Sequence, residues 1–116
     1  MGQPKFKGLE VYAEARRLHL EVFRLTSSFS RELEYLSSQI RRAALSVALN
    51  LAEGSAKQSR KDFHRFVQTS LGSTYEVIAC LEIVTDLTTK DTEQLSRDYY
   101  ELRNRLGALA KYLTST

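Results

Sequence analysis

The sequence contains one proline, one cysteine and no tryptophan among its 116 residues. Because the proline stands at position 4, no proline ring interrupts a helix anywhere beyond the first residues. Cys80, the single cysteine, excludes a disulfide within the chain and a cysteine-based metal site built by one chain. No stretch approaches the ~18 apolar residues of a membrane span, and the opening MGQPKFKG lacks the apolar core of a secretory signal. These absences predict a cytoplasmic protein with no membrane partner.

Motifs for catalysis and for cofactor binding are also missing. Neither His19 nor His64 has a cysteine, a second histidine or a carboxylate nearby at the spacing of a metal site. The pair Gly54-Ser55 lacks the second glycine and the Gly-Lys-Ser/Thr ending of a phosphate-binding loop. Cys80 is predicted to be a small apolar residue at the edge of the core. We therefore predict no catalytic residue, no metal and no cofactor, and we keep an enzyme only as a remote alternative.

Helical periodicity appears four times along the chain, and alternation typical of strands appears nowhere. The clearest series has apolar or aromatic residues stepping by three and four at Leu95, Tyr99, Leu102, Leu106, Leu109 and Leu113. We predict helices over residues 9–28, 31–53, 59–87 and 92–114. Short connections make sequential helices antiparallel. The predicted fold is all-α, an up-down-up-down antiparallel four-helix bundle that forms one domain over residues 1–116, with residues 1–7 as a flexible N-terminal arm.

Local signals mark the predicted helix ends. Gly54 fits the C′ glycine that ends a helix in a left-handed conformation. Ser59 with Asp62 fits a capping box at the start of the third helix. Asp91 with Gln94 fits a cap on the fourth helix.

Several large apolar residues lie away from the predicted core stripes, at helical spacing from one another. Leu20 and Phe23 lie on the first helix, Leu45 and Leu49 on the second, and Ile83 on the third. Large residues at such spacing indicate a second buried face, so we predict self-association. The residues proposed for the oligomer interface are Leu45, Leu49 and Ile83.

Positive charge is concentrated in residues 39–65, although the net charge of the whole chain is only +3. A segment of this kind predicts an anionic partner, with side chains contacting phosphates near a helix N-terminus. The alternative is a solvated face with no ligand. The candidate nucleic-acid-binding residues are Arg41, Arg42, Lys57, Arg60, Lys61 and Arg65.

Asn50 and Glu53, near the end of the second helix, are interpreted as structural residues. We expect Asn50 to bond the end of a neighbouring helix, and Glu53 to pair with Arg41, Arg42 or Arg65. Direct contact of Asn50 and Glu53 with a ligand is the alternative.

The run QIRRAALSVALNLAEGSAKQSRKDFHRF, followed by GSTYEV, resembles the 23S rRNA intervening-sequence proteins, also called four-helix bundle proteins. The family run is close to QIRRAxxSIxxNIAEG, then a basic turn, then F-x-x-F and G-S-x-x-E. The opening from Phe6, FKGLEVYAEA, is also similar, and the resemblance extends from about residue 6 to residue 113. The matching residues are Gln39, Arg41, Arg42, Ser46, Asn50, Ala52, Glu53, Gly54, Phe63, Phe66, Gly72, Ser73 and Glu76.

Three positions depart from the family pattern. Val47 and Leu51 replace common isoleucines, which changes little in an apolar core. Ala48 stands where proline is frequent, which removes a cause of helix bending.

The resemblance implies a cytoplasmic bacterial protein. A more distant similarity to Avd, the basic pentameric accessory protein of diversity-generating retroelements, implies a homopentamer that binds nucleic acid and a reverse transcriptase. The preferred function is therefore a non-enzymatic, homo-oligomeric nucleic-acid-binding or scaffold protein, directed to RNA. The alternative is an adaptor whose oligomer binds a partner protein.

Overall fold

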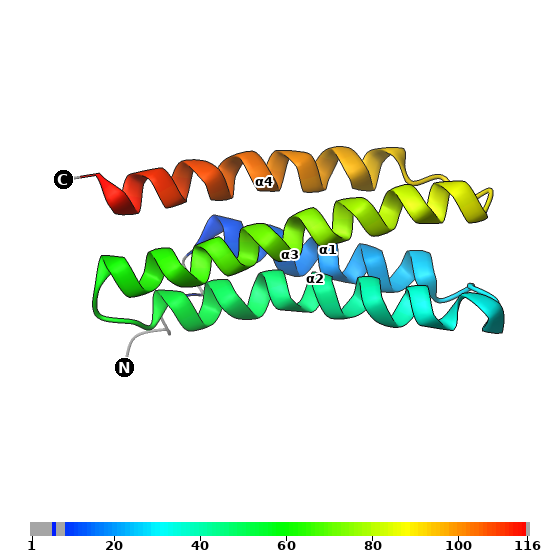
Figure 1. Ribbon diagram of the computed structural model, residues 1–116, viewed down its shortest axis with the longest axis horizontal. Helices are drawn as coiled ribbons and strands as arrows, with labels where there is room; N and C mark the ends of the chain where they lie inside the picture. The colour runs from blue at the N-terminus through cyan, green and yellow to red at the C-terminus, as the bar shows by residue number, and fades with distance from the viewer. Residues whose placement is uncertain (1–5, 7–8, 116) are drawn as a thin grey trace.

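The computed structural model describes residue 6 and residues 9–115, and over these residues the protein is all-α, with no strand. Its elements are α1 (Glu10–Thr26), the short 3₁₀ helix η2 (Arg31–Leu33), α2 (Glu34–Ser55), α3 (Arg60–Leu87) and α4 (Glu93–Thr114) (Figure 1). The prediction of an all-α protein with four helices is confirmed. Apart from Phe6, the predicted arm over residues 1–7 lies outside the described residues.

Each long helix packs against two of the others, in the pairs α1–α2, α2–α3, α3–α4 and α1–α4. Figure 1 shows the α2–α3 turn at one end of the molecule and the other two connections at the opposite end. Side-chain pairs between α2 and α3 run in opposite order along the two helices, since Gln39 bonds Glu76 and Ser46 bonds Ser73. This is the direction that the predicted up-down-up-down order requires.

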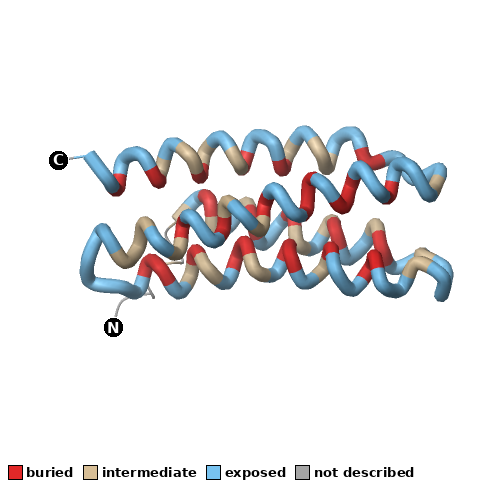
Figure 2. The backbone as a smooth tube through the Cα atoms, viewed as in Figure 1, coloured by how far each residue is buried: buried red, intermediate tan, exposed pale blue. Residues whose placement is uncertain are grey.

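The buried side chains come from one stripe on each helix (Figure 2). Leu18, Ile40, Leu81 and Leu102 are almost wholly buried. The stripe predicted for α4 is buried at Tyr99, Leu102, Leu106 and Leu113, and its two other residues pack partly buried against the same core. The core therefore follows the periodicity in the sequence. Cys80 is also buried, and burial raises the pKa of its thiol.

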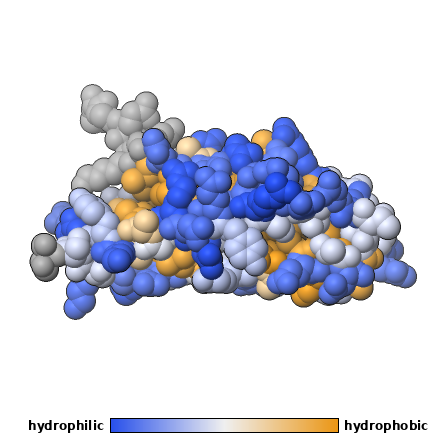
Figure 3. Space-filling view, turned by 90° about the horizontal axis from the view of Figure 1, so that it is seen from above, coloured by the Kyte–Doolittle hydropathy of each residue, from blue (hydrophilic) through white to orange (hydrophobic). Residues whose placement is uncertain are grey.

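Large apolar side chains also remain on the surface of the single chain. Leu20, Phe23, Leu45, Leu49 and Ile83 are all exposed, each at 43–55% of its full area. Figure 3 shows hydrophobic patches on a largely hydrophilic face, one of them toward the end that carries the α1–α2 and α3–α4 connections. None of the described helices has the length and apolarity needed to cross a membrane.

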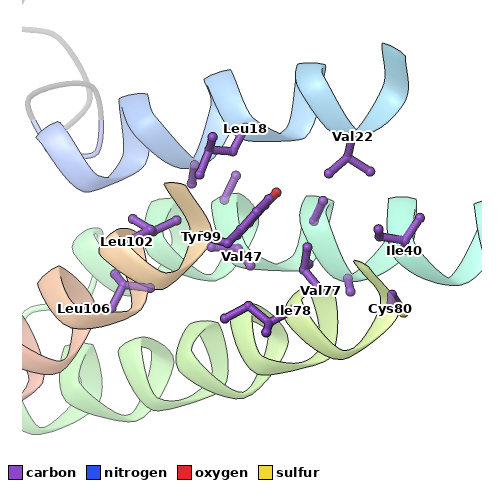
Figure 4. Close-up of a cluster of buried hydrophobic side chains, with 14 of the residues drawn as sticks. Leu18, Val22, Ile40, Val47, Val77, Ile78, Cys80, Tyr99, Leu102 and Leu106 are labelled. Atoms are coloured by element: carbon purple, nitrogen blue, oxygen red, sulfur yellow. The ribbon is translucent and has the colours of Figure 1, made fainter. Parts of the chain in front are cut away.

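Tyr99 is the largest fully buried side chain of the core. Figure 4 shows it crossing from α4, with its hydroxyl directed toward α1 between Leu18 and Val22. Among the described residues, this hydroxyl is the one buried side-chain oxygen or nitrogen without a hydrogen-bond partner. Burial, with a smaller contribution from the charge of Glu14, raises the pKa of Tyr99 well above its ordinary value.

Two of the three helix-end predictions are confirmed in part. The Ser59 hydroxyl accepts a hydrogen bond from the Asp62 backbone N–H at 3.1 Å, which confirms Ser59 as the N-cap of α3. The reciprocal half of the predicted capping box is not formed, because the Asp62 carboxylate accepts a hydrogen bond from Arg65 at 3.4 Å. At the start of α4, the Asp91 carboxylate accepts a hydrogen bond from the Glu93 N–H at 3.0 Å. Gln94 does not complete this cap, because its amide donates to Asp98 at 3.0 Å.

The prediction for Gly54 is wrong. Helix α2 continues through Gly54 to Ser55, and none of the described glycines has a positive φ. Gly54 is buried instead against α3. A Cβ at this position would lie 2.6 Å from the Phe66 Cβ and 3.0 Å from the Phe63 Cδ1. The glycine therefore permits close approach of two helices and does not provide a left-handed turn.

Candidate nucleic-acid interface

Four basic side chains gather where α2 turns into α3. We call this set, Lys57, Arg60, Lys61 and Arg65, the basic corner; all four residues are exposed. The turn between α2 and α3 spans four residues and includes Lys57, whereas the three other residues lie in α3; Figure 2 shows this turn as exposed. The sequence places the residues there because Ser59 starts α3 immediately after a short polar turn.

Aromatic rings hold three of the four cations of the basic corner. The Lys57 ammonium lies 5.2 Å from the centre of the Phe66 ring, and the Arg65 guanidinium lies 5.6 Å from it. The Arg60 guanidinium lies 4.6 Å from the Tyr112 ring and donates a hydrogen bond to the Tyr112 carbonyl oxygen. Cation–π contacts at exposed sites contribute about 0.5–1 kcal/mol each. These contacts limit the positions of the charges while leaving them open to solvent.

Carboxylates neutralise little of this charge. Arg65 pairs with Asp62 at 3.4 Å, but both side chains are at least half exposed, and such pairs are weak. Lys57 and Lys61 form no ion pair with any described residue. Glu53 is exposed, and the predicted ion pair from Glu53 to Arg41, Arg42 or Arg65 is not formed within the described part of the chain.

The N-terminus of α3 adds to the positive potential of the basic corner. The first turn of a helix has N–H groups without partners inside the helix, and the aligned peptide dipoles place partial positive charge there. Ser59 occupies one of these N–H groups, that of Asp62. A helix N-terminus beside exposed lysines is an arrangement that suits a phosphate group.

Arg41 and Arg42 do not belong to this corner, which corrects the view that the six candidate residues converge. Arg41 precedes Ser55 by 14 residues in α2, which is about 21 Å along the helix axis. Its guanidinium donates to the Thr26 hydroxyl at 2.7 Å and lies 4.4 Å from the Phe23 ring centre. Arg41 therefore joins α2 to the end of α1.

Arg42 lies on the exposed face of α2. It lines an open depression whose other lining residues are Leu45, Ser46, Leu49, Asn50 and Glu53. All of them belong to α2, so the depression is a surface feature of one helix.

The polar residues in the centre of α2 link it to α3. Asn50 donates to the Ser46 carbonyl oxygen at 2.9 Å and to the Ser46 hydroxyl at 3.0 Å, and Ser46 meets Ser73 of α3 at 2.7 Å. Asn50 therefore reaches the neighbouring helix through Ser46, and it does not bond a helix end as expected. Ser70 adds a second link by donating to the Val47 carbonyl oxygen at 2.8 Å. These contacts give Asn50 a structural role.

One neighbour of the basic corner comes from the far end of the chain. Tyr112, in the last turn of α4, accepts a hydrogen bond from Arg60 across 52 residues. Sequence patterns did not single out Tyr112, because its position depends on how α4 packs. The signal that points to it is the predicted up-down-up-down order, which brings the end of α4 to the start of α3.

Metal-ligating side chains do not cluster in the described part of the chain, where no group of three or more His, Cys, Asp or Glu residues could hold an ion. His64 lies beside the basic corner, and its ring is 3.2 Å from the Gln68 amide. His19 is half-buried on α1.

Comparison with known proteins identifies the family of the chain. No curated protein matches the chain. The family model described as 23S rRNA-intervening sequence protein matches residues 7–115. That match covers nearly the whole chain, including the basic corner and all four helices. The protein therefore belongs to the 23S rRNA-intervening sequence protein family.

Proposed function

We propose that this protein is a non-enzymatic, homo-oligomeric RNA-binding protein of the cytoplasm, built as an up-down-up-down four-helix bundle. The basic corner contacts the phosphates of the RNA. The observation that carries this proposal is the convergence of Lys57, Arg60, Lys61 and Arg65 at the capped N-terminus of α3. Lys57 and Lys61 supply charge that no described carboxylate neutralises.

Contacts to phosphates explain affinity without sequence preference. Phosphate groups are the same at every nucleotide, so side chains that bind them fix the position of the RNA and do not read its bases. Release of counterions makes such binding strongly dependent on salt.

Self-association would multiply the basic corner. Leu45, Leu49 and Ile83 remain exposed in the single chain, which supports burial against another copy. The distant similarity to the pentameric protein Avd supplies the number five. Five chains with a net charge of +3 each carry +15, and repeated sites on one particle raise avidity without any new contact.

A protein-binding adaptor is the second candidate, and the same exposed apolar residues favour it. In that case Leu45 and Leu49 would bind a different protein, such as the reverse transcriptase suggested by the distant similarity. The basic corner would then only keep the particle in solution. The two functions differ in whether RNA affinity depends on the lysines of the corner.

Charge reversal tests the proposal. Lys57→Glu combined with Lys61→Glu should lower RNA affinity by at least about tenfold, because two phosphate contacts become repulsive. The matched control is Arg31→Glu combined with Lys90→Glu, which changes the net charge equally at the opposite end of the bundle. Equal affinities for the two double variants, with helix content unchanged in both, would contradict the proposal and favour the adaptor.

A further inference from the structure

A second surface, formed by α3 and α4, has a chemistry different from that of the basic corner. It is an open groove of about 620 Å³, within the ~300–1,000 Å³ range of small-ligand sites. We call it the tyrosine groove. Its lining includes no carboxylate, and the residues that the argument uses are Gln68, Gly72, Tyr75, Arg103, Asn104 and Gly107.

No contact within the chain requires glycine at the two glycine positions of the tyrosine groove. Gly72 lies in α3 and Gly107 in α4, away from the helix ends, where glycine costs about 1 kcal/mol relative to alanine. A Cβ at either position would meet nothing within 4 Å, in contrast to Gly54. Packing between α3 and α4 therefore does not require these glycines. Their effect is to keep the groove open.

Arg103 of the tyrosine groove lies near two exposed rings: Tyr75, which lines the groove, and Tyr100, which lies beside it. Its guanidinium lies 5.7 Å from the centre of the Tyr75 ring and 5.5 Å from that of Tyr100. It also donates to the Tyr75 hydroxyl at 3.2 Å and to the Asn104 amide oxygen at 2.7 Å. The two tyrosines nevertheless remain 53% and 45% exposed. The cluster thus presents ordered flat surfaces and hydrogen-bond donors to solvent.

The tyrosine groove continues from the basic corner. Along α3, Lys61, Arg65, Gln68, Gly72 and Tyr75 follow one another at steps of three or four, so they lie along one side of the helix. The distance from Lys61 to Tyr75 is 14 residues, or about 21 Å. A strand bound at the basic corner by its phosphates can extend directly into the groove.

We propose that the tyrosine groove binds bases of the single-stranded nucleic acid whose phosphates the basic corner holds. This inference rests on the proposed function and adds base contacts to it. Base rings stack on Tyr75 and Tyr100, as on the aromatic platforms of other single-strand-binding proteins. The amides of Gln68 and Asn104 lie where they can bond base edges, and the missing side chains of Gly72 and Gly107 give the ring room.

The test compares an oligouridine of about 12 nucleotides, within the ~4–16-nucleotide range of single-strand sites, with an abasic ribose-phosphate of equal length and charge. Stacking contributes about 1–3 kcal/mol per base, so wild-type protein should bind the oligouridine at least about fivefold more tightly. Tyr75→Ala combined with Tyr100→Ala should remove this difference and leave the affinity for the abasic strand unchanged. Tyr35→Ala, which removes an exposed ring of α2, is the control and should keep the difference.

A second variant, Gly72→Leu, places a side chain in the tyrosine groove at a position where its Cβ meets nothing within 4 Å, and it should act like the tyrosine double variant. Equal binding of the two strands by wild-type protein would overturn the inference and leave the proposed function intact. Absence of binding to both strands would overturn both. If Gly72→Leu changes the sedimentation of the protein, the groove is an interface between copies of the chain, and the inference fails.

Discussion

Single glycines have distinct structural roles in this protein. Gly54 is enclosed by Phe63 and Phe66, whereas Gly72 and Gly107 face open space. We expect Gly54→Ala to lower the free energy of unfolding by about 1–3 kcal/mol, the usual cost of overpacking, although alanine is the better helix former. Urea unfolding measures the change.

Gly72→Ala and Gly107→Ala provide the matched comparison for Gly54→Ala. With no atom near the new methyl group, each should raise the free energy of unfolding by about 0.5–1 kcal/mol. A loss of stability at Gly72 as large as that at Gly54 would mean that the close approach of α2 and α3 is not what Gly54 provides.

The buried hydroxyl of Tyr99 predicts an unusual response to pH. Its pKa in the folded protein is raised by burial, so folding disfavours the ionised form. The contribution of Tyr99 ionisation to the free energy of unfolding is fully present below the pKa of the unfolded chain, about 10. It is lost as the pH rises from there through the raised pKa of the folded protein. Tyr99→Phe should therefore weaken the fall in stability above about pH 10. Because the hydroxyl has no described partner, this variant should be no less stable than wild type at pH 7.

The N-terminal cap of α3 positions the basic corner. Ser59→Ala removes the acceptor for the Asp62 N–H and should lower the free energy of unfolding by about 0.5–2 kcal/mol. Ser59→Asp keeps a hydrogen-bond acceptor at the same place and should lower the free energy of unfolding much less. Thermal unfolding followed by circular dichroism separates the two, and equal losses would show that the cap contributes nothing.

The helices themselves were predictable from sequence. The predicted spans 59–87 and 92–114 differ by one residue at their starts from α3 and α4 and agree at their ends. Periodicity and caps are local properties, so the chain itself carries them. The predicted span 31–53 departs at both ends, because the 3₁₀ helix η2 precedes α2 and α2 continues to Ser55.

The composition of the candidate site was less predictable, for reasons of geometry. Arg41 and Lys57 belong to one basic segment of the sequence, but the rise of α2 separates them along the bundle. Gly54 marks either a turn or a close contact, and the sequence does not distinguish the two. Tyr75 and Arg103 meet only because α3 packs against α4. Residues that converge across helices depend on the bundle register, which local patterns do not fix.

For the whole molecule, the exposed apolar residues predict association. Wild-type protein should sediment as an oligomer at micromolar concentration. Leu45→Glu combined with Leu49→Glu should produce monomers with unchanged helix content, because both side chains are exposed in the single chain. Tyr35→Glu, on the same helix, should leave the oligomer intact. A monomeric wild-type protein would contradict this prediction, whereas a stable dimer would contradict only the number five.

The salt dependence of RNA binding tests the central claim most directly. A plot of the logarithm of affinity against the logarithm of salt concentration should fall with a slope of about −0.7 for each phosphate contact to a single strand. Lys57→Glu combined with Lys61→Glu should make the slope shallower by about 1.4 per chain engaged, because two contacts are lost. A wild-type affinity that is independent of salt, or a slope that the double variant leaves unchanged, would contradict the account.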